Sequence, residues 1–527
     1  MKLTVFKAKT DLSLWGGLGA VIFGVLCFFW GSVLSFFPVP WPDDSAFYLP
    51  GIQWISSSPR YLMHAQAPFV PTYDQANFNT MPALPFLFGV AHQLGVSTSH
   101  ALRLFGVAVF GLWTFALAVF SRRLGLGWGL TFLVTLCALF SPSIRWGAMV
   151  VRPEIWQGLI WLLLVLEILS DRVKLWRISF LLACAAYIHF EAFLWIVPVA
   201  LGLFSTKGGV AQGVRNLKGV FVRTFVFLIP WLIYVLLNWD VFWIQMNTQF
   251  GRLHSHHPYI TSVHSFFHSL FMELGNPVSF PKFFNLAKII TWVMIAFGIC
   301  RGLERAWQDP RVRPTALASV AALCGTFYLW MTKPETWFTA MIHLALWVLF
   351  VFALSGVSLR LKQIWTFVLS LLLVLHVGVA VVQWRGAVGH YSWDRYESWV
   401  DCIDSTIGSR TKIWQPHWPD VLVQLAGKNP DRDYTRAVDF QNIDALIDKH
   451  ALSREVIIHS LFLPLDLPMS RIEFRGAPRS EDLYYLTDYP WMPFKQYSAA
   501  NPIMKGWSLH MCQRGPFWAA VSLKGEH

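Results

Sequence analysis

The chain has 527 residues, of which 55% are hydrophobic and only 14% charged, and its mean hydropathy is +0.46. This composition excludes an ordinary soluble domain. The net charge of +12 does not form one basic patch of the kind that binds nucleic acid, because Lys and Arg gather in alternate loops, near 2–9, 122–123, 172–177, 207–223, 301–313 and 360–362. That is the positive-inside bias of membrane proteins. We therefore expect contact with membrane lipids, a cytoplasmic N-terminus and no nucleic-acid partner.

The apolar runs are long enough to cross a hydrocarbon core of about 30 Å and too continuous for the strands of a barrel. They predict an all-α polytopic membrane bundle of about eleven transmembrane helices. The first run follows three lysines, as a signal peptide would, but its length and the lack of a small-x-small cleavage site predict a retained anchor. The predicted spans are 12–37, 101–121, 127–141, 155–170, 176–188, 191–204, 219–238, 285–303, 315–331, 337–355 and 363–383.

Two segments decide this count. The apolar segment 82–94 is too short to span and is predicted to lie in the outer interface as a juxtamembrane helix. The stretch 176–204 is predicted to form two short helices that turn at His189-Phe190-Glu191, because one long helix would reverse the sides of the later basic loops.

The character of the chain changes near Gln383, which divides it into a transmembrane domain, 1–383, and an exterior domain, 384–527. Short strand patterns at 411–416, 437–440 and 456–460 alternate with helical patterns at 419–426 and 442–451, which predicts a small C-terminal α/β domain. Cys402 and Cys512 both fall in it. An oxidising compartment would permit a disulfide between them, and the sequence leaves open whether they are bonded.

An adjacent carboxylate pair, Asp43-Asp44, follows the first span in the segment Trp41–Tyr48. Two like charges a few ångströms apart disfavour each other's ionisation, so such a pair at a membrane surface indicates a catalytic base and its partner. The alternative is a solvated acidic loop that begins with a proline turn.

Ionisable residues recur at the exterior ends of later spans, where they are expensive and mark function. Together they suit transfer from a phosphate-bearing lipid, since a carboxylate can deprotonate an acceptor while a cation neutralises the departing phosphate. The alternative for each residue taken singly is a charge that sets the topology or extends to the membrane interface. The residues are Arg145, Arg152, Glu154, His189, Glu191, Lys333 and Glu335.

In order and topology these motifs resemble the GT-C superfamily of membrane glycosyltransferases, which includes protein O-mannosyltransferases and aminoarabinose lipid A transferases. The resemblance covers roughly residues 10–380. It rests on the acidic motif at 42–48, the juxtamembrane segment 81–87, the segment 101–106 that opens the second span, Arg152-Pro153-Glu154, and Lys333 before the aromatic-rich segment 337–340. Where relatives often place His or Lys before the first juxtamembrane proline, this chain has Asn79-Thr80-Met81.

The resemblance implies an inverting glycosyltransferase that uses a polyprenyl-phosphate-linked sugar donor. Asp43 would be the catalytic base, with Asp44 and Glu154 completing the catalytic set or holding a divalent metal, Mg²⁺ or Mn²⁺. The departure at 79–81 implies that Arg60, His64 or Lys333 contacts the donor phosphate. The substrate-binding residues expected on this basis are Arg152, Lys333, Tyr48, His189 and Arg60.

The expected acceptor is a hydroxyl or amine of a lipid, glycan or protein. The expected location is a bacterial inner membrane, with the C-terminal domain in the periplasm. Two other functions stay open: a carrier or flippase for a lipid-linked precursor, and a non-catalytic scaffold of the same fold. No inverted repeat or pair of broken helices favours the carrier, and fold alone does not grant activity.

Overall fold

The structure is a computed structural model. It describes residues 12–33, 42–56, 60–62, 75–78, 80–96, 99–149, 152–170, 173–205, 209–255, 284–332, 336–387, 393–415, 421–436, 456–462, 507–514 and 517–524. The chain divides into two compact units. Unit 1 comprises 1–30, 105–239 and 247–383, and unit 2 comprises 31–104, 240–246 and 384–527. Helices α1, α4, α11 and α16 contribute to both units.

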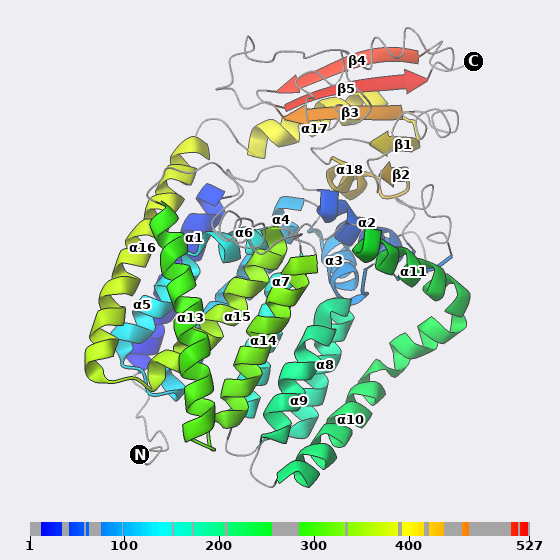
Figure 1. The fold of residues 1–527 in the computed structure, drawn as a ribbon. Helices are drawn as coiled ribbons and strands as arrows, with labels where there is room; N and C mark the ends of the chain where they lie inside the picture. Colours follow the sequence, from blue (N-terminus) through cyan, green and yellow to red (C-terminus); the bar gives the residue numbers. More distant parts are fainter. Residues whose placement is uncertain are drawn as a thin grey trace. The chain divides into compact units, whose positions relative to one another are not determined.

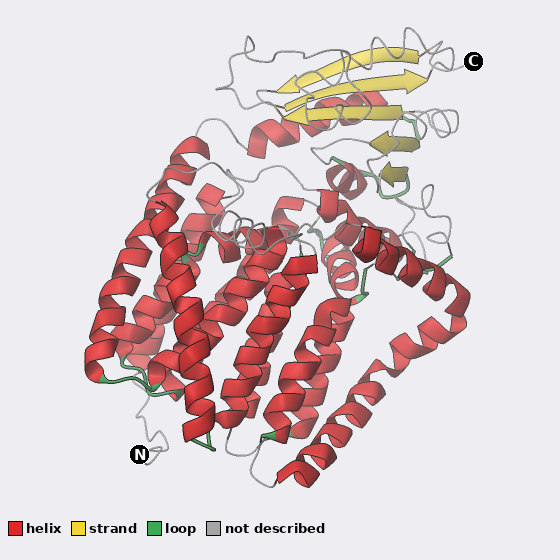
Figure 2. Ribbon diagram, viewed as in Figure 1, coloured by secondary structure: helices red, strands yellow, loops and turns green. Residues whose placement is uncertain are grey.

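Unit 1 is built from helices (Figures 1 and 2). Four described helices are long and apolar enough to cross a membrane, by length and composition alone, over 103–123, 211–237, 286–308 and 359–381. The full count of spans stays a prediction. The helices are α1 (Leu12–Val33), α4 (Ser99–Arg123), α5 (Trp128–Leu139), α6 (Pro142–Met149), α7 (Glu154–Ile168), α8 (Leu175–Ile188), η3 (Phe190–Trp195), α9 (Ile196–Phe204), α10 (Gly209–Leu237), α13 (Phe284–Gln308), α14 (Arg313–Thr332), α15 (Thr336–Ser355) and α16 (Leu359–Ala387).

Helix α15 forms the core of unit 1. From Ala340 to Leu354, every side chain but His343 is a buried hydrophobic one, and His343 is buried as well. A helix that is apolar on all sides has to be buried, and α15 packs against α6, α7, α13 and α14 (Figure 1). Helix α10 is the opposite case: Val222, Phe225 and Leu237 are all more than half exposed. An exposed apolar helix of this length is suited to contact with lipid.

The break predicted within 176–204 is confirmed. Helix α8 ends at Ile188, and His189 adopts an extended backbone with φ −161° and ψ 148°. The chain then continues as the 3-10 helix η3, which leads into α9. His189 and Glu191 therefore lie in an irregular turn between two apolar helices.

Unit 2 includes α2 (Pro42–Ser56) and α3 (Ala83–Gln93), the second of which coincides with the predicted juxtamembrane helix. The two helices cross closely. A Cβ placed on Gly51 would lie 1.9 Å from the Pro85 carbonyl oxygen, and one on Gly89 would lie 2.3 Å from the Gly51 carbonyl oxygen. Only glycine fits at both positions, so glycine fixes how α2 packs on α3.

A five-stranded mixed sheet lies in the same unit, with the order β2-β1-β3-β5-β4 (Figure 2). Strand β1 is parallel to β2 and β3, while β5 is antiparallel to β3 and β4. Strands β1 and β3 coincide with two predicted strands, whereas 437–451 lies outside the described residues. The elements are α11 (Trp239–Ser255), α17 (Trp393–Ile407), β1 (Lys412–Gln415), α18 (Leu422–Lys428), β2 (Asp433–Arg436), β3 (Val456–Phe462), β4 (Trp507–Arg514) and β5 (Phe517–Lys524).

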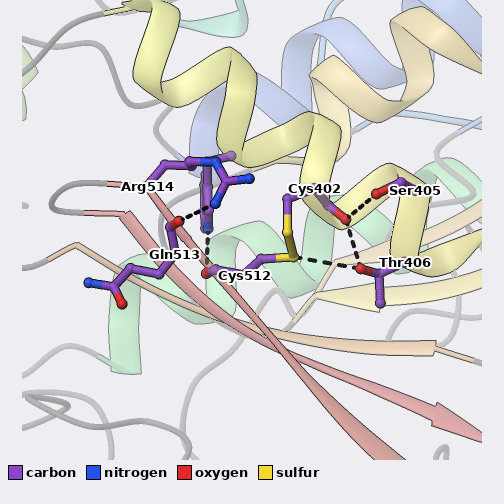
Figure 3. The surroundings of a disulfide bond; sticks show 7 residues. Cys402, Ser405, Thr406, Cys512, Gln513 and Arg514 are labelled. Atoms are coloured by element: carbon purple, nitrogen blue, oxygen red, sulfur yellow. Dashed lines mark hydrogen bonds between the residues drawn. A yellow bond between two sulfur atoms is a disulfide. The ribbon is translucent and has the colours of Figure 1, made fainter.

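Cys402 and Cys512 form a disulfide that joins α17 to β4 across 110 residues of sequence (Figure 3). The Cα atoms are 5.8 Å apart, within the usual range for a disulfide. The question that the sequence left open is thus answered, and α17 is covalently held on the sheet.

Candidate functional site

Arg152 and Glu154 form a buried ion pair where α7 begins. Arg152 donates from Nε to Glu154 Oε1 at 3.0 Å, and its Nη2 lies 2.9 Å from the same oxygen. Glu154 is fully buried, and Arg152 is 8% exposed. The acidic residue stands in the first turn of the helix, where the macrodipole favours negative charge. Within the described residues, Glu154 Oε2 has no hydrogen-bond partner.

A second charged pair lies in the turn after α8. His189 Nδ1 accepts a hydrogen bond from the Glu191 backbone N–H at 3.4 Å and lies 3.3 Å from Glu191 Oε2. An imidazole nitrogen cannot accept one hydrogen bond and donate another at once. While Nδ1 accepts from the backbone, Glu191 Oε2 therefore receives no donor from it, and the described residues offer no other.

These four residues interact electrostatically, since Glu154 is within range of both Glu191 and His189. We call Arg152, Glu154, His189 and Glu191 the α7–η3 cluster. The cluster lies within unit 1 and is almost completely buried. The two buried carboxylate oxygens without a hydrogen-bond partner favour a ligand that brings hydrogen-bond donors.

Gln157 links the segments that carry the cluster. Its Nε2 donates to the Ala185 carbonyl oxygen at 2.8 Å, and Trp195 Nε1 donates to Gln157 Oε1 at 2.8 Å. The Trp195 ring also stacks on Trp161 of α7 at a centroid distance of 5.1 Å. Gln157 is one turn from Glu154, and Trp195 is four residues after Glu191. These contacts fix α7, α8 and η3 against one another beneath the four charged side chains.

The acidic motif lies on α2 in unit 2, and here the structure differs from the expectation of a loop. Asp43 and Asp44 are the second and third residues of a helix that starts at Pro42. Their side chains lie outside the described residues. Proline in the first position followed by acidic residues is a sequence signal for a helix start. The alternative of a solvated loop that begins with a proline turn is therefore not what the structure shows.

The other predicted substrate-binding residues are in different situations. Tyr48 is fully buried, and its ring packs edge-on against Phe88 of α3 at 4.4 Å. Arg60 is exposed. Lys333 lies outside the described residues. The structure therefore brings Arg152, Glu154 and His189 together and adds Glu191, while the roles expected for Tyr48, Arg60 and Lys333 stay predictions.

A divalent metal held by Asp44 and Glu154 also stays a prediction. Glu154 offers one carboxylate oxygen without a partner, but its other oxygen is bonded to a guanidinium. Among the described side chains, no three or more His, Cys, Asp or Glu are grouped so that they could hold a metal ion. The described part of the site thus does not by itself form a metal centre.

No family model and no curated protein matches the sequence. Solved structures do match. ArnT from Cupriavidus metallidurans bound to undecaprenyl phosphate is 13% identical, with a TM-score of 0.60 over 97% of this chain and 99% of that one. The apo oligosaccharyltransferase from Archaeoglobus fulgidus is 11% identical, with a TM-score of 0.51 over 86% of this chain and 70% of that one. The chain therefore has the fold of these two solved structures, which is the kind of fold that the resemblance in the sequence implied.

Proposed function

We propose that this chain is an integral membrane glycosyltransferase that moves a sugar from a polyprenyl-phosphate donor to an acceptor hydroxyl or amine. The observation that carries the proposal is the fold likeness to ArnT, which extends over nearly the whole of both chains. Undecaprenyl phosphate is bound in that structure. Because a fold can host several functions, the buried α7–η3 cluster matters as well: its burial is costly, and function is a reason to keep it.

The proposed mechanism is a single inverting displacement. Asp43 removes the proton from the acceptor as the acceptor atom attacks the anomeric carbon. The bond between that carbon and the phosphate oxygen breaks, and the polyprenyl phosphate leaves with the electron pair. Arg152 and Lys333 neutralise the charge that develops on the phosphate. A divalent ion at Asp44 and Glu154 would supply the same kind of neutralisation, and none of these steps uses it.

The proposed location is an inner membrane, with about eleven spans, a cytoplasmic N-terminus and the C-terminal domain in the periplasm. The basic loops support this orientation. The disulfide supports it independently, because such bonds persist in oxidising compartments and are rare in the cytosol. The proposed acceptor is a lipid, glycan or protein of the cell envelope.

The test is donor turnover with Asp43→Asn. Purified protein is incubated with radiolabelled undecaprenyl-phosphate-linked sugars and crude envelope acceptor, and label released from the lipid is counted. We expect the substitution to lower turnover by about a thousandfold, within the range for loss of a general base. Asp240→Asn is the matched control, since Asp240 is an exposed acid in the first turn of another described helix.

Each other outcome has a clear meaning. Full turnover by Asp43→Asn would refute the base assignment. Transbilayer movement of the donor without bond cleavage would replace the transferase by a carrier. Absence of both would leave a scaffold of this fold.

A further inference from the structure

Glu191 and Glu154 share an unusual feature: each is almost wholly buried and has one carboxylate oxygen that no described group serves with a hydrogen bond. Glu154 is fully buried and Glu191 is 2% exposed. In each residue that oxygen is Oε2. A buried acceptor without a donor is costly, and native proteins rarely keep two within electrostatic range of each other unless a ligand or water completes them.

His189 Nδ1 lies 3.3 Å from Glu191 Oε2, but this contact does not form a hydrogen bond to that oxygen. The His189 Nδ1 atom is used by the Glu191 backbone N–H. Arg152 does not serve the free oxygen of Glu154 either, because both of its recorded contacts with that carboxylate go to Oε1. Oε2 of Glu154 and Oε2 of Glu191 are thus both available to accept hydrogen bonds from a ligand.

Geometry favours a ligand with several separated donors over a metal ion. An ion needs its ligand oxygens within about 2.0–2.6 Å of one point, and the described acids and histidines do not meet that requirement. A guanidinium bonded to Glu154 would also repel a dication. The hydroxyl groups of a sugar are spread around a ring, carry no charge and can reach two carboxylates that do not converge.

The cluster is also rigid, as a recognition site has to be. Gln157 bonds both the end of α8 and the Trp195 indole, and Trp195 stacks on Trp161. Glu154 and Glu191 come from different elements, yet these contacts fix their separation before any ligand arrives. Support of this kind preserves the geometry on which sugar selection depends.

We propose that Glu191, with Glu154, binds the transferred sugar by accepting hydrogen bonds from its hydroxyl groups. This inference rests on the proposed function, and it assigns to Glu191 a role in choosing the sugar. Gln157 is a positioning residue in this assignment, since it fixes the two carboxylates without contacting the sugar.

The experiment compares two ligands that differ only in the sugar. Equilibrium binding to the full-length protein is measured with undecaprenyl phosphate and with a panel of undecaprenyl-phosphate-linked pentoses and hexoses, each with and without a chelator. The variants are Glu191→Gln, Glu191→Asp and Gln157→Leu. Glu167→Gln is the matched control, because Glu167 lies on the same helix α7 but pairs with the exposed Arg177.

We expect Glu191→Gln to bind undecaprenyl phosphate like the parent protein and to lose about tenfold or more in affinity for the preferred sugar donor. Glu191→Asp should recover part of that affinity. Gln157→Leu should lose affinity for the donor and discriminate less between sugars. The control should change neither ligand. Thermal unfolding in detergent at the temperature of the parent protein shows that each variant is folded.

Three results would overturn the assignment. Equal loss for both ligands in a folded Glu191→Gln protein would give Glu191 a phosphate or structural role. No loss for either would remove it from the site. If the chelator abolished donor binding, the two carboxylates would bind a metal ion and not the sugar hydroxyls. If the parent protein binds undecaprenyl phosphate but none of the sugar donors, the proposed function fails first and this inference fails with it.

Discussion

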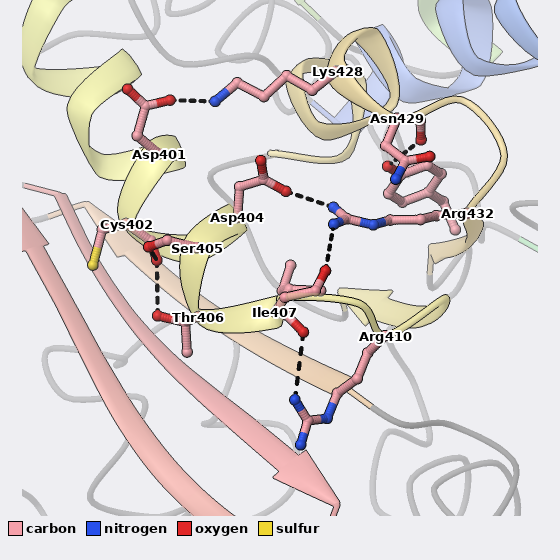
Figure 4. Close-up of polar contacts among 12 residues, drawn as sticks. Asp401, Cys402, Asp404, Ser405, Thr406, Ile407, Arg410, Lys428, Asn429 and Arg432 are labelled. Atoms are coloured by element: carbon pink, nitrogen blue, oxygen red, sulfur yellow. Dashed lines mark hydrogen bonds and ion pairs between the residues drawn. The ribbon is translucent and has the colours of Figure 1, made fainter.

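Arginine meets a carboxylate in two regions of this molecule, in opposite surroundings. In the α7–η3 cluster, Arg152 and Glu154 are buried in an apolar bundle, and a carboxylate oxygen is left over. In unit 2, Arg432 bonds Asp404 at 2.5 Å and the Gly408 carbonyl oxygen at 2.8 Å, while Lys428 pairs with Asp401 (Figure 4). Asp404 and Asp401 there are 27% and 64% exposed.

The two surroundings distinguish ion pairs that hold the fold together from charged groups that serve a function. Gly408 has φ +62°, so it ends α17 with its carbonyl turned to a guanidinium, and each ion pair around it joins one element to the next. The ion pairs of Arg432 and Lys428 need no ligand to stabilise them, because they are hydrogen-bonded and partly hydrated. The α7–η3 cluster is different, because the burial of its charged groups is costly and some of its carboxylate oxygens have no hydrogen-bond donor. A ligand is what would balance it.

The largest expected effect is that of Glu154→Gln, which leaves Arg152 buried without its counter-charge. We expect the free energy of unfolding to fall by about 3 kcal/mol, as for other broken buried pairs. Sugar transfer should fall by at least about a hundredfold. Thermal unfolding in detergent and donor turnover measure the two effects. If Glu154→Gln were as stable as Glu167→Gln, the buried pair would contribute no more to the free energy of unfolding than an exposed one.

An intermediate effect is expected from replacing both Cys402 and Cys512 by serine. The bond closes a long loop, so its loss should lower stability by about 2–4 kcal/mol. The loss should be confined to the sheet of unit 2, and limited proteolysis with mass spectrometry can locate it. Cleavage that spread through the helices of unit 1 would contradict independent stability of the two units.

The smallest effects are expected at the exposed pairs. Asp404→Asn should cost about 1 kcal/mol, because Arg432 is only 8% exposed. Asp401→Asn should cost less than about 0.5 kcal/mol, as for other solvent-exposed pairs. Denaturant titration of both variants at low and high salt gives the comparison. A larger cost at Asp401 than at Asp404 would mean that burial does not rank these contacts.

The sequence allowed much of this arrangement to be predicted where one physical signal was strong. A histidine and a glutamate inside an apolar run located the turn at 189–191, and the short run 82–94 matched α3. The charged residues at the exterior span ends were expected to converge, and Glu154 does lie within electrostatic range of Glu191 and His189. The sequence could not show which atoms would meet, because residues so far apart in the chain become neighbours only through packing. The alternative of a proline turn at Asp43-Asp44 was open because a proline turn and a proline helix start look alike at their first residue.

Strands β4 and β5 were missed altogether. The segment 507–514 alternates apolar and polar residues from Trp507 to Met511, which is a strand signal, but it is short and ends in Cys, Gln and Arg. What makes it a strand is a partner, since β4 pairs along its length with β5, and β5 in turn pairs with β3. The pairing of β5 with β3 joins segments far apart in the chain and leaves no mark in a local window, whereas β4 and β5 are consecutive strands and pair locally.

The strand order also constrains how the chain is made. Strand β3 ends at Phe462, but its antiparallel partner begins only at Phe517. At about 5–20 residues per second, synthesis of the intervening stretch leaves one edge of β3 unpaired for several seconds. Cys402 likewise waits for Cys512. For that interval the growing chain has a bare strand edge and a reactive thiol, so a shielding chaperone and a thiol oxidase would each find their substrate in the unfinished protein.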